Sequence, residues 1–350
     1  MPFDVVIATD LRYPGGSSHS TLNEIRALRH AGYKVALVPI RSARLNPSKR
    51  TNPWLQMVID RGIVSLVDPS DQAVDARLAI LRNPYGLDAL IEPSPRLHAA
   101  HNILVVNHPP INGYGVPCYD PRRVSENCKT LTGKDVVWAP NSPLVRRMLE
   151  TTPFSGAILN EDWPPILFFG DLAADRQQPV KEIPVIGRHS RPVKAKWPAT
   201  REAILTIYPD DPSIEVRILG FGDVPQRIVG EIPSNWVTFA FNEVLPAEFL
   251  GTIDFFVFYH HPSWIEAIGR GIAEALGSGA VAILPQYFRV TYGDAALYRA
   301  AADVIPTVRE LYGNWKRYTQ QSRLGQEIAK QLFSPQRFID RIRRFIGDPT

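Results

Sequence analysis

The sequence predicts an α/β protein made of two doubly wound domains. Short apolar runs alternate with longer amphipathic stretches through both halves of the chain, which is typical of strands followed by covering helices. A length of 350 residues exceeds what one core commonly supports, and a 45% hydrophobic content fits two well-filled domains. Residues 160–180 hold Pro164, Pro165 and a polar Asp-Arg-Gln-Gln-Pro stretch, and they mark the boundary. We therefore predict domains over residues 1–165 and 166–334, followed by a final helix within 335–350.

The first half is predicted to contain six short strands, several of them separated by helices. Each strand is an apolar run bounded by turn residues. The runs cover residues 5–9, 34–39, 63–67, 78–81, 103–107 and 136–139. The first run is followed by a turn over residues 10–18 that contains Gly15 and Gly16, and then by a helix that ends at Ala31 and Gly32.

The second half repeats the pattern, with strands expected at 185–187, 215–219, 237–241, 255–259 and 281–284. The last two are continuous apolar runs, as in buried parallel strands. Between them we expect a helix that begins near Ala267, with Gly269 and Gly271 in its first turn. Unpaired backbone N–H groups and the helix dipole favour an anion there, and the missing side chains let a diphosphate approach closely.

Two carboxylates bracket this expected anion site. Glu266 and Glu274 are eight residues apart, which is about 12 Å along a helix axis. That distance is on the order of the span from a transferred sugar to the ribose of its nucleotide. The alternative interpretation is ordinary acidic residues at a helix start, which the helix dipole favours in any protein.

Three segments together resemble the retaining glycosyltransferases of the GT-B fold, family 4 type. Residues 261–279 resemble that family's motif of two glutamates separated by seven residues, and residues 10–18 resemble its first glycine-rich turn. Residues 184–198 resemble its strand that ends in Gly-Arg, with a lysine a few residues later. Here the spacing is longer and Trp197 takes the place of a glycine, so Lys194 and Lys196 both remain candidates for that lysine.

The resemblance implies two Rossmann-like domains with a cleft between them and a C-terminal helix that crosses back to the first domain. It also implies transfer of a sugar, with retention, from a nucleoside diphosphate sugar to a glycan, lipid-linked or other hydroxyl acceptor. Arg188 and Lys196 would neutralise the leaving diphosphate without a metal ion. Two alternatives stay open: a non-catalytic nucleotide-sugar-binding or scaffold protein, and a nucleotide-sugar epimerase of the same fold.

The resemblance also assigns roles to the remaining candidates. Glu266 is expected to bind the sugar, and Glu274 the ribose hydroxyls. The further residues expected to line the nucleotide-sugar site are Gly15, Gly16, Gly220, Phe221, Phe241, Gly269 and Arg270. His108 is a candidate for positioning the sugar or acceptor, with an ordinary strand-end histidine as the alternative. Arg12 and His19 are weaker acceptor-site candidates.

Several other kinds of site are not expected. The chain has no Asp-x-Asp, His-Glu-x-x-His or Cys-x-x-Cys motif, so no metal site is predicted, and Cys118 and Cys128 are expected to stay reduced. Gly220-Phe221-Gly222 begins like a dinucleotide fingerprint, but Pro225 takes the third glycine position and is expected to disrupt an immediate helix. No cofactor is therefore expected besides the donor substrate.

Positive residues cluster in two places, although the net charge is only +4. One cluster is Arg41, Arg44, Lys49 and Arg50, and the other is Arg337, Arg341, Arg343 and Arg344. Both are candidates for peripheral contact with anionic lipid or acidic glycan, with a solvated surface as the alternative. Nucleic acid is not expected, because neither cluster is interleaved with aromatic stacking residues in a recognised binding module. Without a membrane-spanning run or a signal peptide, the expected location is cytoplasmic, with the inner face of the membrane as a candidate site of contact.

Overall fold

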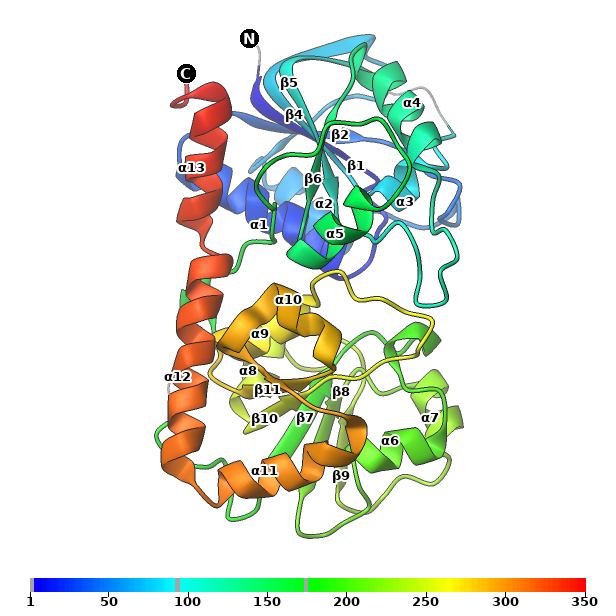
Figure 1. The fold of residues 1–350 in the computed structure, drawn as a ribbon. Coiled ribbons are helices and arrows are strands. Elements are labelled where there is room, and N and C mark those ends of the chain that lie inside the picture. Colours follow the sequence, from blue (N-terminus) through cyan, green and yellow to red (C-terminus); the bar gives the residue numbers. More distant parts are fainter. Residues whose placement is uncertain (1–2, 92–94, 173–175) are drawn as a thin grey trace. The chain divides into compact units, whose positions relative to one another are not determined.

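The computed structural model describes residues 3–91, 95–172 and 176–350. The chain divides into two compact units: unit 1 comprises residues 1–166 and 334–350, and unit 2 comprises residues 167–333. Each unit holds one six-stranded parallel sheet (Figure 1). The predicted α/β class with two doubly wound sheets is confirmed.

The sheet of unit 1 has the order β3-β2-β1-β4-β5-β6. Its strands are β1 (Phe3–Thr9), β2 (Val35–Pro39), β3 (Ser65–Leu66), β4 (Ala73–Arg82), β5 (Arg96–Val106) and β6 (Val137–Pro140). From β1 the chain builds outward to β2 and β3, and it then returns to the other side of β1 with β4. The strand order therefore reverses between β1 and β4, and the carboxyl ends of these two strands form a topological switch point, where ligands of such sheets bind.

The helices of unit 1 are α1 (Gly16–His30), α2 (Pro53–Asp60), α3 (Pro84–Leu87), α4 (Pro121–Thr132), α5 (Pro143–Glu150) and α13 (Pro335–Ile346). All except α1 begin at a proline, and the residue before that proline caps the helix with its side chain: Asn52, Asn83, Asp120, Ser142 or Ser334. Proline fits the first helical position because the N–H that it lacks has no partner there. By contrast, α1 follows Gly15 and has no side-chain cap.

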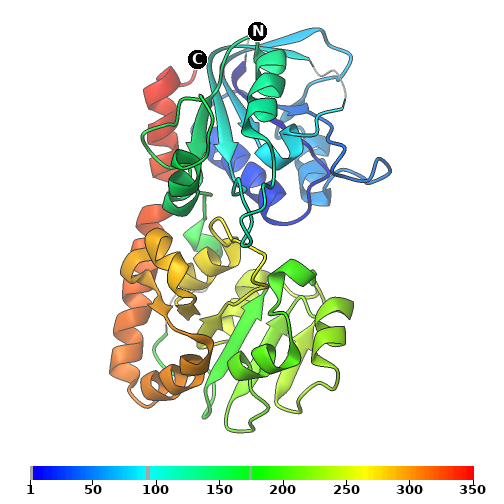
Figure 2. The same cartoon turned by 45° about the vertical axis from the view of Figure 1, so that its right-hand side comes forward.

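Helix α13 packs on unit 1 beside α1, and both views show it along this unit (Figures 1 and 2). It buries Phe338, Ile339, Ile342 and Ile346, which recur on one face of the helix. Tyr33 also donates a hydrogen bond of 2.7 Å to the carbonyl oxygen of Gly347. The C-terminal residues therefore belong structurally with the N-terminal part of the chain.

The sheet of unit 2 has the order β12-β11-β10-β7-β8-β9. Its strands are β7 (Val185–His189), β8 (Glu215–Leu219), β9 (Trp236–Phe239), β10 (Phe255–Val257), β11 (Val281–Leu284) and β12 (Leu297–Tyr298). From β7 the chain builds outward to β8 and β9, and it then returns to the other side of β7 with β10. The switch point of this sheet therefore lies between β7 and β10.

Helices cover both faces of the second sheet. They are α6 (Arg201–Ile207), α7 (Asp223–Val229), α8 (Pro246–Gly251), α9 (Arg270–Gly277), α10 (Arg289–Tyr292), α11 (Val304–Tyr312) and α12 (Trp315–Leu332). One apolar cluster contains residues of α8, α9 and α12, and another contains residues of α6, α7 and α11. Short 3-10 turns lie at Phe169–Asp171, Lys194–Lys196, Gln286–Phe288, Gly293–Ala295 and Ala301–Asp303. Among the described helices, none has the length and hydropathy needed to cross a bilayer.

The structure corrects several predicted boundaries. Strands β4 and β5 begin earlier than expected, because their first halves alternate polar and apolar residues instead of forming an apolar run. Strand β10 ends at Val257, and the two-residue strand β12 was not predicted. The expectation that Pro225 prevents an immediate helix is wrong: α7 begins at Asp223. Pro225 is the third residue of that helix, where its missing N–H has no intrahelical partner.

Candidate functional site

The candidate site of unit 2 lies where the strand order reverses. Arg188 and His189 end β7, and the segment after β10 leads through Glu266 to α9. The carboxyl ends of adjacent parallel strands meet at one edge of a sheet, so these segments are neighbours although about 70 residues separate them in sequence. The ends of β8 and β9 bring Gly220, Phe221 and Phe241 to the same edge.

Helix α9 begins at Arg270, not near Ala267 as expected. Gly269 precedes it with φ 68°, in the left-handed region that glycine occupies without strain, and no side chain caps the helix. Glu266 therefore lies in the irregular loop before the helix, and the expected spacing of two glutamates along one helix axis is wrong. The first N–H groups of α9 lack intrahelical partners, as at any helix start, and the first turn of α9 has no acidic residue.

Arg188 is fully buried. Its guanidinium donates hydrogen bonds to the carbonyl oxygens of Tyr259, at 3.0 Å, and Lys196, and it also bonds the hydroxyl of Ser190 at 3.1 Å. The ring of Trp197 lies 4.2 Å from the guanidinium carbon. Within the described residues, no carboxylate forms an ion pair with it, and burial lowers its pKa. Arg188 thus adds positive charge beneath the site and ties the 190–197 segment to the segment after β10.

Lys196 and Glu266 form an ion pair whose two side chains are nearly buried, at 12% and 13% exposure. The Lys196 ammonium also lies 4.8 Å from the centre of the Trp264 ring, and the Trp264 Nε1–H donates to the Glu266 carboxylate at 3.3 Å. Lys194, the other candidate lysine, is exposed, and its side chain forms no ion pair or hydrogen bond with any described residue. The structure therefore brings Lys196, rather than Lys194, to the motif glutamate.

The charges of this pair are mutually stabilised. Burial alone would raise the pKa of Glu266, but the ammonium of Lys196 and the hydrogen bonds from Lys196 and Trp264 hold that pKa below its ordinary value. Burial lowers the pKa of Lys196, and Glu266 opposes that effect. Both groups are therefore expected to be charged near neutral pH. A ligand that binds one of them and breaks the ion pair has to supply a new partner for the other.

Glu274 forms a second ion-paired group. Its carboxylate accepts a hydrogen bond of 2.6 Å from Arg270 Nε, one turn earlier on α9, and lies 3.4 Å from His189 Nε2. Gly271 permits this contact, since a Cβ there would lie 2.9 Å from His189 Nε2. Burial lowers the pKa of His189 and outweighs the nearby Glu274 carboxylate. Glu274 is therefore held by one fixed cation and one neutral imidazole.

Gly220, Phe221 and Phe241 form the third part of the site. Gly220 has φ 91°, and a Cβ at this position would lie 1.9 Å from the Ser190 carbonyl oxygen and 3.6 Å from the Phe241 ring. Only glycine lets the loops after β7 and β8 approach this closely. Phe221 packs edge-on against Trp197, with ring centres 6.1 Å apart, and Phe241 is 40% exposed. Phe241 thus offers a free aromatic face beside the glycine.

Several residues of this region were not predicted as site residues. His260 follows β10, and its Nε2 lies 2.5 Å from the Tyr287 hydroxyl. Tyr292 donates hydrogen bonds to the carbonyl oxygens of Ile268 and Gly269. A polar residue directly after a predicted buried strand was a usable signal for His260. Tyr287 lies in the 3-10 turn after β11 and Tyr292 ends α10, and nothing in the sequence pattern connects them to the glutamates.

The other predicted site residues lie in unit 1, around its own switch point. Gly15 has φ 67° and precedes α1, and Gly16 is the first residue of that helix. Arg12 is buried and bonds the Asp10 carboxylate at 2.6 and 2.9 Å, together with the carbonyl oxygens of Ser42 and Asn46. His108 is half-buried after β5 and stacks on Tyr85 at 5.1 Å. Arg12 therefore binds Asp10 and two backbone carbonyl oxygens in this conformation, and its assignment to an acceptor remains a prediction.

His19, on α1, is the remaining acceptor candidate. Its ring centre lies 6.1 Å from that of Trp54, which is 44% exposed at the start of α2. The structure places His19 on α1 and His108 after β5. Their assignment to an acceptor remains a prediction.

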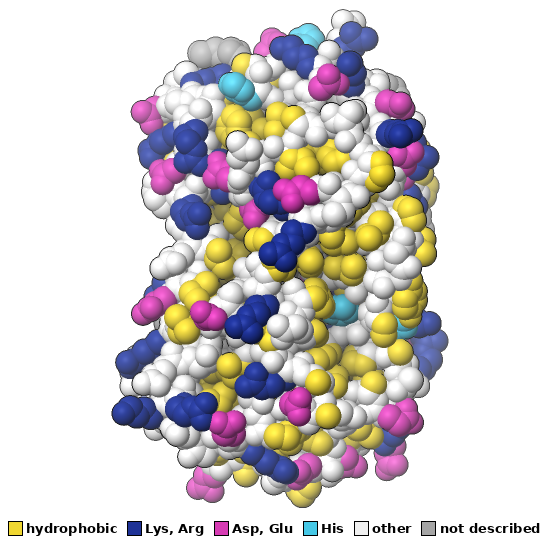
Figure 3. Space-filling model, in the orientation of Figure 1, with side chains coloured by type: hydrophobic (Ala, Val, Ile, Leu, Met, Phe, Trp, Pro, Cys, Tyr) yellow, Lys and Arg dark blue, Asp and Glu magenta, His cyan; other side chains and the backbone are white. Residues whose placement is uncertain are grey.

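The two basic clusters differ in how far their charges are paired. In the C-terminal cluster, Arg341 and Arg344 bind Glu161, and Arg343 binds Asp340 and Asp348. In the other cluster, Arg44 binds Asp88, whereas Lys49 and Arg50 are exposed. Figure 3 shows basic and acidic side chains interspersed over the face that it displays. Contact of either cluster with lipid remains a prediction.

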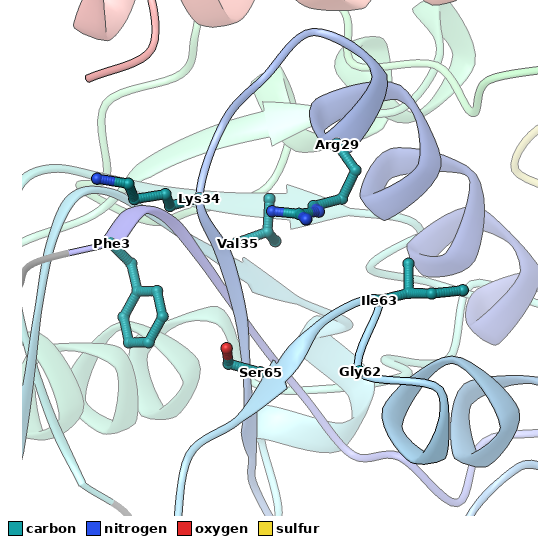
Figure 4. A pocket seen from close by; sticks show the side chains of 7 residues that line it. All are labelled: Phe3, Arg29, Lys34, Val35, Gly62, Ile63 and Ser65. Atoms are coloured by element: carbon teal, nitrogen blue, oxygen red, sulfur yellow. The ribbon is translucent and has the colours of Figure 1, made fainter.

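One hollow of about 290 Å³ lies at the amino-terminal ends of strands in the unit 1 sheet, away from their carboxyl ends. Phe3, Val35 and Ser65, at the first residues of β1, β2 and β3, line it together with Arg29, Lys34, Gly62 and Ile63. In Figure 4 the Arg29 side chain reaches toward Val35, while the Lys34 amine points away. Ligands of doubly wound sheets bind at the carboxyl ends of strands, so we do not assign the site here. Among the described residues, no group of His, Cys, Asp or Glu side chains is placed to hold a metal ion.

Comparison with known proteins places the fold. No protein-family model and no curated protein sequence matches the chain. HepE from Anabaena, solved with UDP and glucose, is similar over 98% of each chain, with a TM-score of 0.67 and 10% sequence identity. Sucrose-phosphate synthase from Thermosynechococcus elongatus is similar over 98% of each chain, with a TM-score of 0.67 and 12% identity. WaaG, a glycosyltransferase involved in lipopolysaccharide biosynthesis, covers 97% of this chain and 99% of its own, with a TM-score of 0.57 and 13% identity.

At these identities the similarity is one of fold. Two six-stranded parallel sheets and similarity along the whole chain show that the predicted GT-B fold is correct. The family 4 assignment, the retaining mechanism and the site residues remain predictions. The chain therefore has the fold of GT-B glycosyltransferases.

Proposed function

We propose that this protein is a glycosyltransferase that moves a sugar from a nucleoside diphosphate sugar to a hydroxyl acceptor, with retention and without a metal ion. One observation carries the proposal. At the switch point of unit 2, the uncapped start of α9 is flanked by two ion-paired carboxylates, Glu266 with Lys196 and Glu274 with Arg270. Backbone N–H groups suit a diphosphate, and the two carboxylates suit hydroxyl groups.

The roles follow from this arrangement. The diphosphate would bind at the N–H groups that follow Gly269, with Lys196 as its mobile cation and Arg188 as buried positive charge beneath it. Glu274 would accept hydrogen bonds from the ribose, and the exposed face of Phe241 would contact the base. Glu266 would bind the sugar hydroxyls once Lys196 has turned to the phosphate.

The chemical step is departure of the diphosphate from the anomeric carbon, with the acceptor hydroxyl arriving on the same face. Negative charge grows on the leaving oxygens, and preorganised N–H groups and Lys196 stabilise it more in the transition state than in the ground state. The leaving phosphate would take the acceptor proton, so no enzymic nucleophile is required. The acceptor, a glycan or a lipid-linked hydroxyl, would be held by unit 1, with His108 as the positioning candidate.

The complete burial of Arg188 favours one competing function, a protein that binds a nucleotide sugar without transferring it. A guanidinium enclosed by Trp197 and backbone carbonyls cannot touch a phosphate in this conformation. The two functions differ in turnover and not in binding.

A donor screen tests the proposal. Thermal shift with UDP, GDP, ADP and dTDP and their sugars should identify one nucleotide that stabilises the protein. Release of that nucleoside diphosphate from its sugar donor should then be detectable and should be lost in Glu266→Ala. Binding without release would support the non-catalytic alternative. Release accompanied by a change of sugar configuration, with no acceptor needed, would indicate an epimerase.

A further inference from the structure

The loop that carries Glu266 is hydrogen-bonded to two tyrosines of the segment that follows β11. Residues 261–269 form no regular structure between β10 and α9. The backbone N–H of Glu266 donates a hydrogen bond of 3.4 Å to the Tyr287 hydroxyl oxygen. At the end of the loop, the Tyr292 hydroxyl donates to the carbonyl oxygens of Ile268 and Gly269. The two tyrosines therefore fix the loop at the glutamate itself and at the helix start.

His260 decides which way the Tyr287 hydroxyl points. His260 Nδ1 lies 2.9 Å from the His261 carbonyl oxygen, which can only accept, so Nδ1 carries the proton. In the neutral ring Nε2 is then an acceptor, and it lies 2.5 Å from the Tyr287 hydroxyl. Tyr287 must donate to His260, and this leaves an oxygen lone pair for the N–H of Glu266.

A proton on Nε2 would reverse this arrangement. His260 would then donate to the tyrosine oxygen, and the hydroxyl hydrogen would have to turn elsewhere. The charged and titratable groups around His260 are Tyr287, Glu266, Lys196 and Arg188, and burial keeps the pKa of His260 below its ordinary value. His260 is therefore neutral near pH 7, so Tyr287 can donate to His260 Nε2 and accept from the Glu266 N–H.

We propose that Tyr287 and His260 are positioning residues for Glu266: His260 orients the Tyr287 hydroxyl, and Tyr287 fixes the backbone from which the Glu266 carboxylate reaches the sugar. This inference rests on the function proposed above for Glu266. Neither residue touches the reacting atoms. Their effect is expected in turnover, because the orientation of the sugar matters most in the transition state.

The kinetic test compares tyrosines that lose the same kind of hydrogen bond. Tyr287→Phe should lower kcat about tenfold on the donor found by the screen, while the Kd for the bare nucleoside diphosphate changes less than about twofold. The control is Tyr318→Phe, which removes a buried hydroxyl bonded at 2.6 Å to the Asp254 carbonyl, away from the loop. This control should keep kcat within about twofold of the original protein. Equal losses in both variants would overturn the proposal.

Two variants of His260 sharpen the test. His260→Leu removes the acceptor and should resemble Tyr287→Phe. In His260→Gln an amide oxygen can accept from Tyr287, so most of the turnover should return. The decline of kcat at acid pH that protonation of Nε2 causes should also be absent in His260→Gln. An unchanged acid decline, or a glutamine variant as slow as the leucine variant, would overturn the role of His260.

Hydrogen exchange provides a readout that needs no donor. Peptides within residues 263–269 should exchange faster in Tyr287→Phe than in the original protein, whereas peptides of α9 and of β7 should not. Exchange that is unchanged in the loop overturns the inference even if transfer is observed. Faster loop exchange in a protein that turns over no donor would instead leave the tyrosine contact standing and refute the proposed function.

Discussion

Helices α1 and α9 begin at the switch points of their sheets in the same way, but their surroundings differ. Both follow a glycine with positive φ, 67° at Gly15 and 68° at Gly269, and neither has a side-chain cap or an acidic residue in its first turn. In the loop before α1, the ion pair of Asp10 with Arg12 is buried, and Arg12 also binds a backbone carbonyl oxygen. Beside α9, two nearly buried carboxylates form ion pairs, Glu266 with Lys196 and Glu274 with Arg270.

The comparison separates what the fold provides from what the side chains add. A doubly wound sheet produces a bare helix start at its switch point in each unit, and each start can bind an anion through backbone N–H groups. In the described part of unit 2, that start is accompanied by two ion pairs, Glu266 with Lys196 and Glu274 with Arg270. We therefore place donor chemistry in unit 2, and the following predictions test that difference.

The largest effect is expected from the two glutamates. Glu266→Ala should lower kcat about 100-fold, because its bonds to the sugar matter most in the transition state. Its affinity for the bare nucleoside diphosphate should be unchanged or higher, since Lys196 loses its competing partner. Glu274→Ala should instead weaken that affinity about tenfold, because the ribose is present in both ligands. Calorimetric titration beside donor kinetics measures both.

Equal losses of diphosphate affinity in the two glutamate variants would mean that Glu266 is misassigned. No loss of diphosphate affinity in either variant would indicate that both glutamates are ordinary acidic residues near a helix start. Glu24→Gln is not a suitable control, since Glu24 forms a buried ion pair with Arg82 in unit 1. Glu310→Ala, which removes an exposed carboxylate on α11, is the matched control.

The next effect concerns a glycine in the first turn of each helix. Gly271→Ala would push its Cβ against His189 and should destabilise the protein by roughly 1–3 kcal/mol, with the Glu274 contact disturbed. Around Gly16 nothing lies within 4 Å of a built Cβ, so Gly16→Ala should be neutral or stabilising by up to about 1 kcal/mol. Chemical denaturation of both variants checks the pair, and equal effects would contradict the distinction.

A smaller effect is expected from acid. Burial lowers the pKa of His189 and of His260 below their ordinary value, so the unfolded chain binds more protons than the folded one as the pH falls below 6.5. Stability is complete above that pH and is lost below it, by at most about 1.4 kcal/mol per pH unit for each histidine. Urea unfolding between about pH 7.5 and 5.5 should show this slope, and His260→Gln should reduce it. A slope that His260→Gln does not change would show that His260 is not its source.

The smallest effect is expected from chelation. Turnover should persist in excess EDTA, because Lys196, Arg188 and the start of α9 supply the positive potential. Added magnesium should change the rate little. Loss of turnover in EDTA that magnesium or manganese restores would contradict the metal-independent mechanism and would favour an ion as the diphosphate ligand.

The sequence was sufficient for the parts of the fold that depend on continuous patterns. The apolar runs of β1, β2 and β11 are read directly, because buried parallel strands are hydrophobic on both faces. The predicted start of α9 is wrong because Ala267 and Ile268, the residues before it, suit a helix by composition. The left-handed conformation of Gly269, which separates the loop from the helix, is evident only in the structure. Local propensity does not determine such a boundary.

The candidate site shows the same division. Glu266, Glu274, Arg188 and Lys196 were found because their spacing resembles a known motif, and the structure brings Lys196 to Glu266. The burial of Arg188 and the pairing of Glu274 with His189 depend on packing between elements far apart in the chain. Tyr287 reaches Glu266 from 21 residues away, and no periodicity in the sequence encodes that contact.

The resting pair of Lys196 and Glu266 also bears on product release. Under the proposed function, the intact donor offers phosphate oxygens to Lys196 and sugar hydroxyls to Glu266. Each residue therefore gains a new partner when the ion pair breaks. The spent nucleoside diphosphate still binds the lysine but leaves the nearly buried glutamate without its cation, which is costly. Re-formation of the Lys196–Glu266 ion pair would then compete with the bound nucleoside diphosphate. The ion pair that the donor breaks on binding would therefore promote release of the product after transfer.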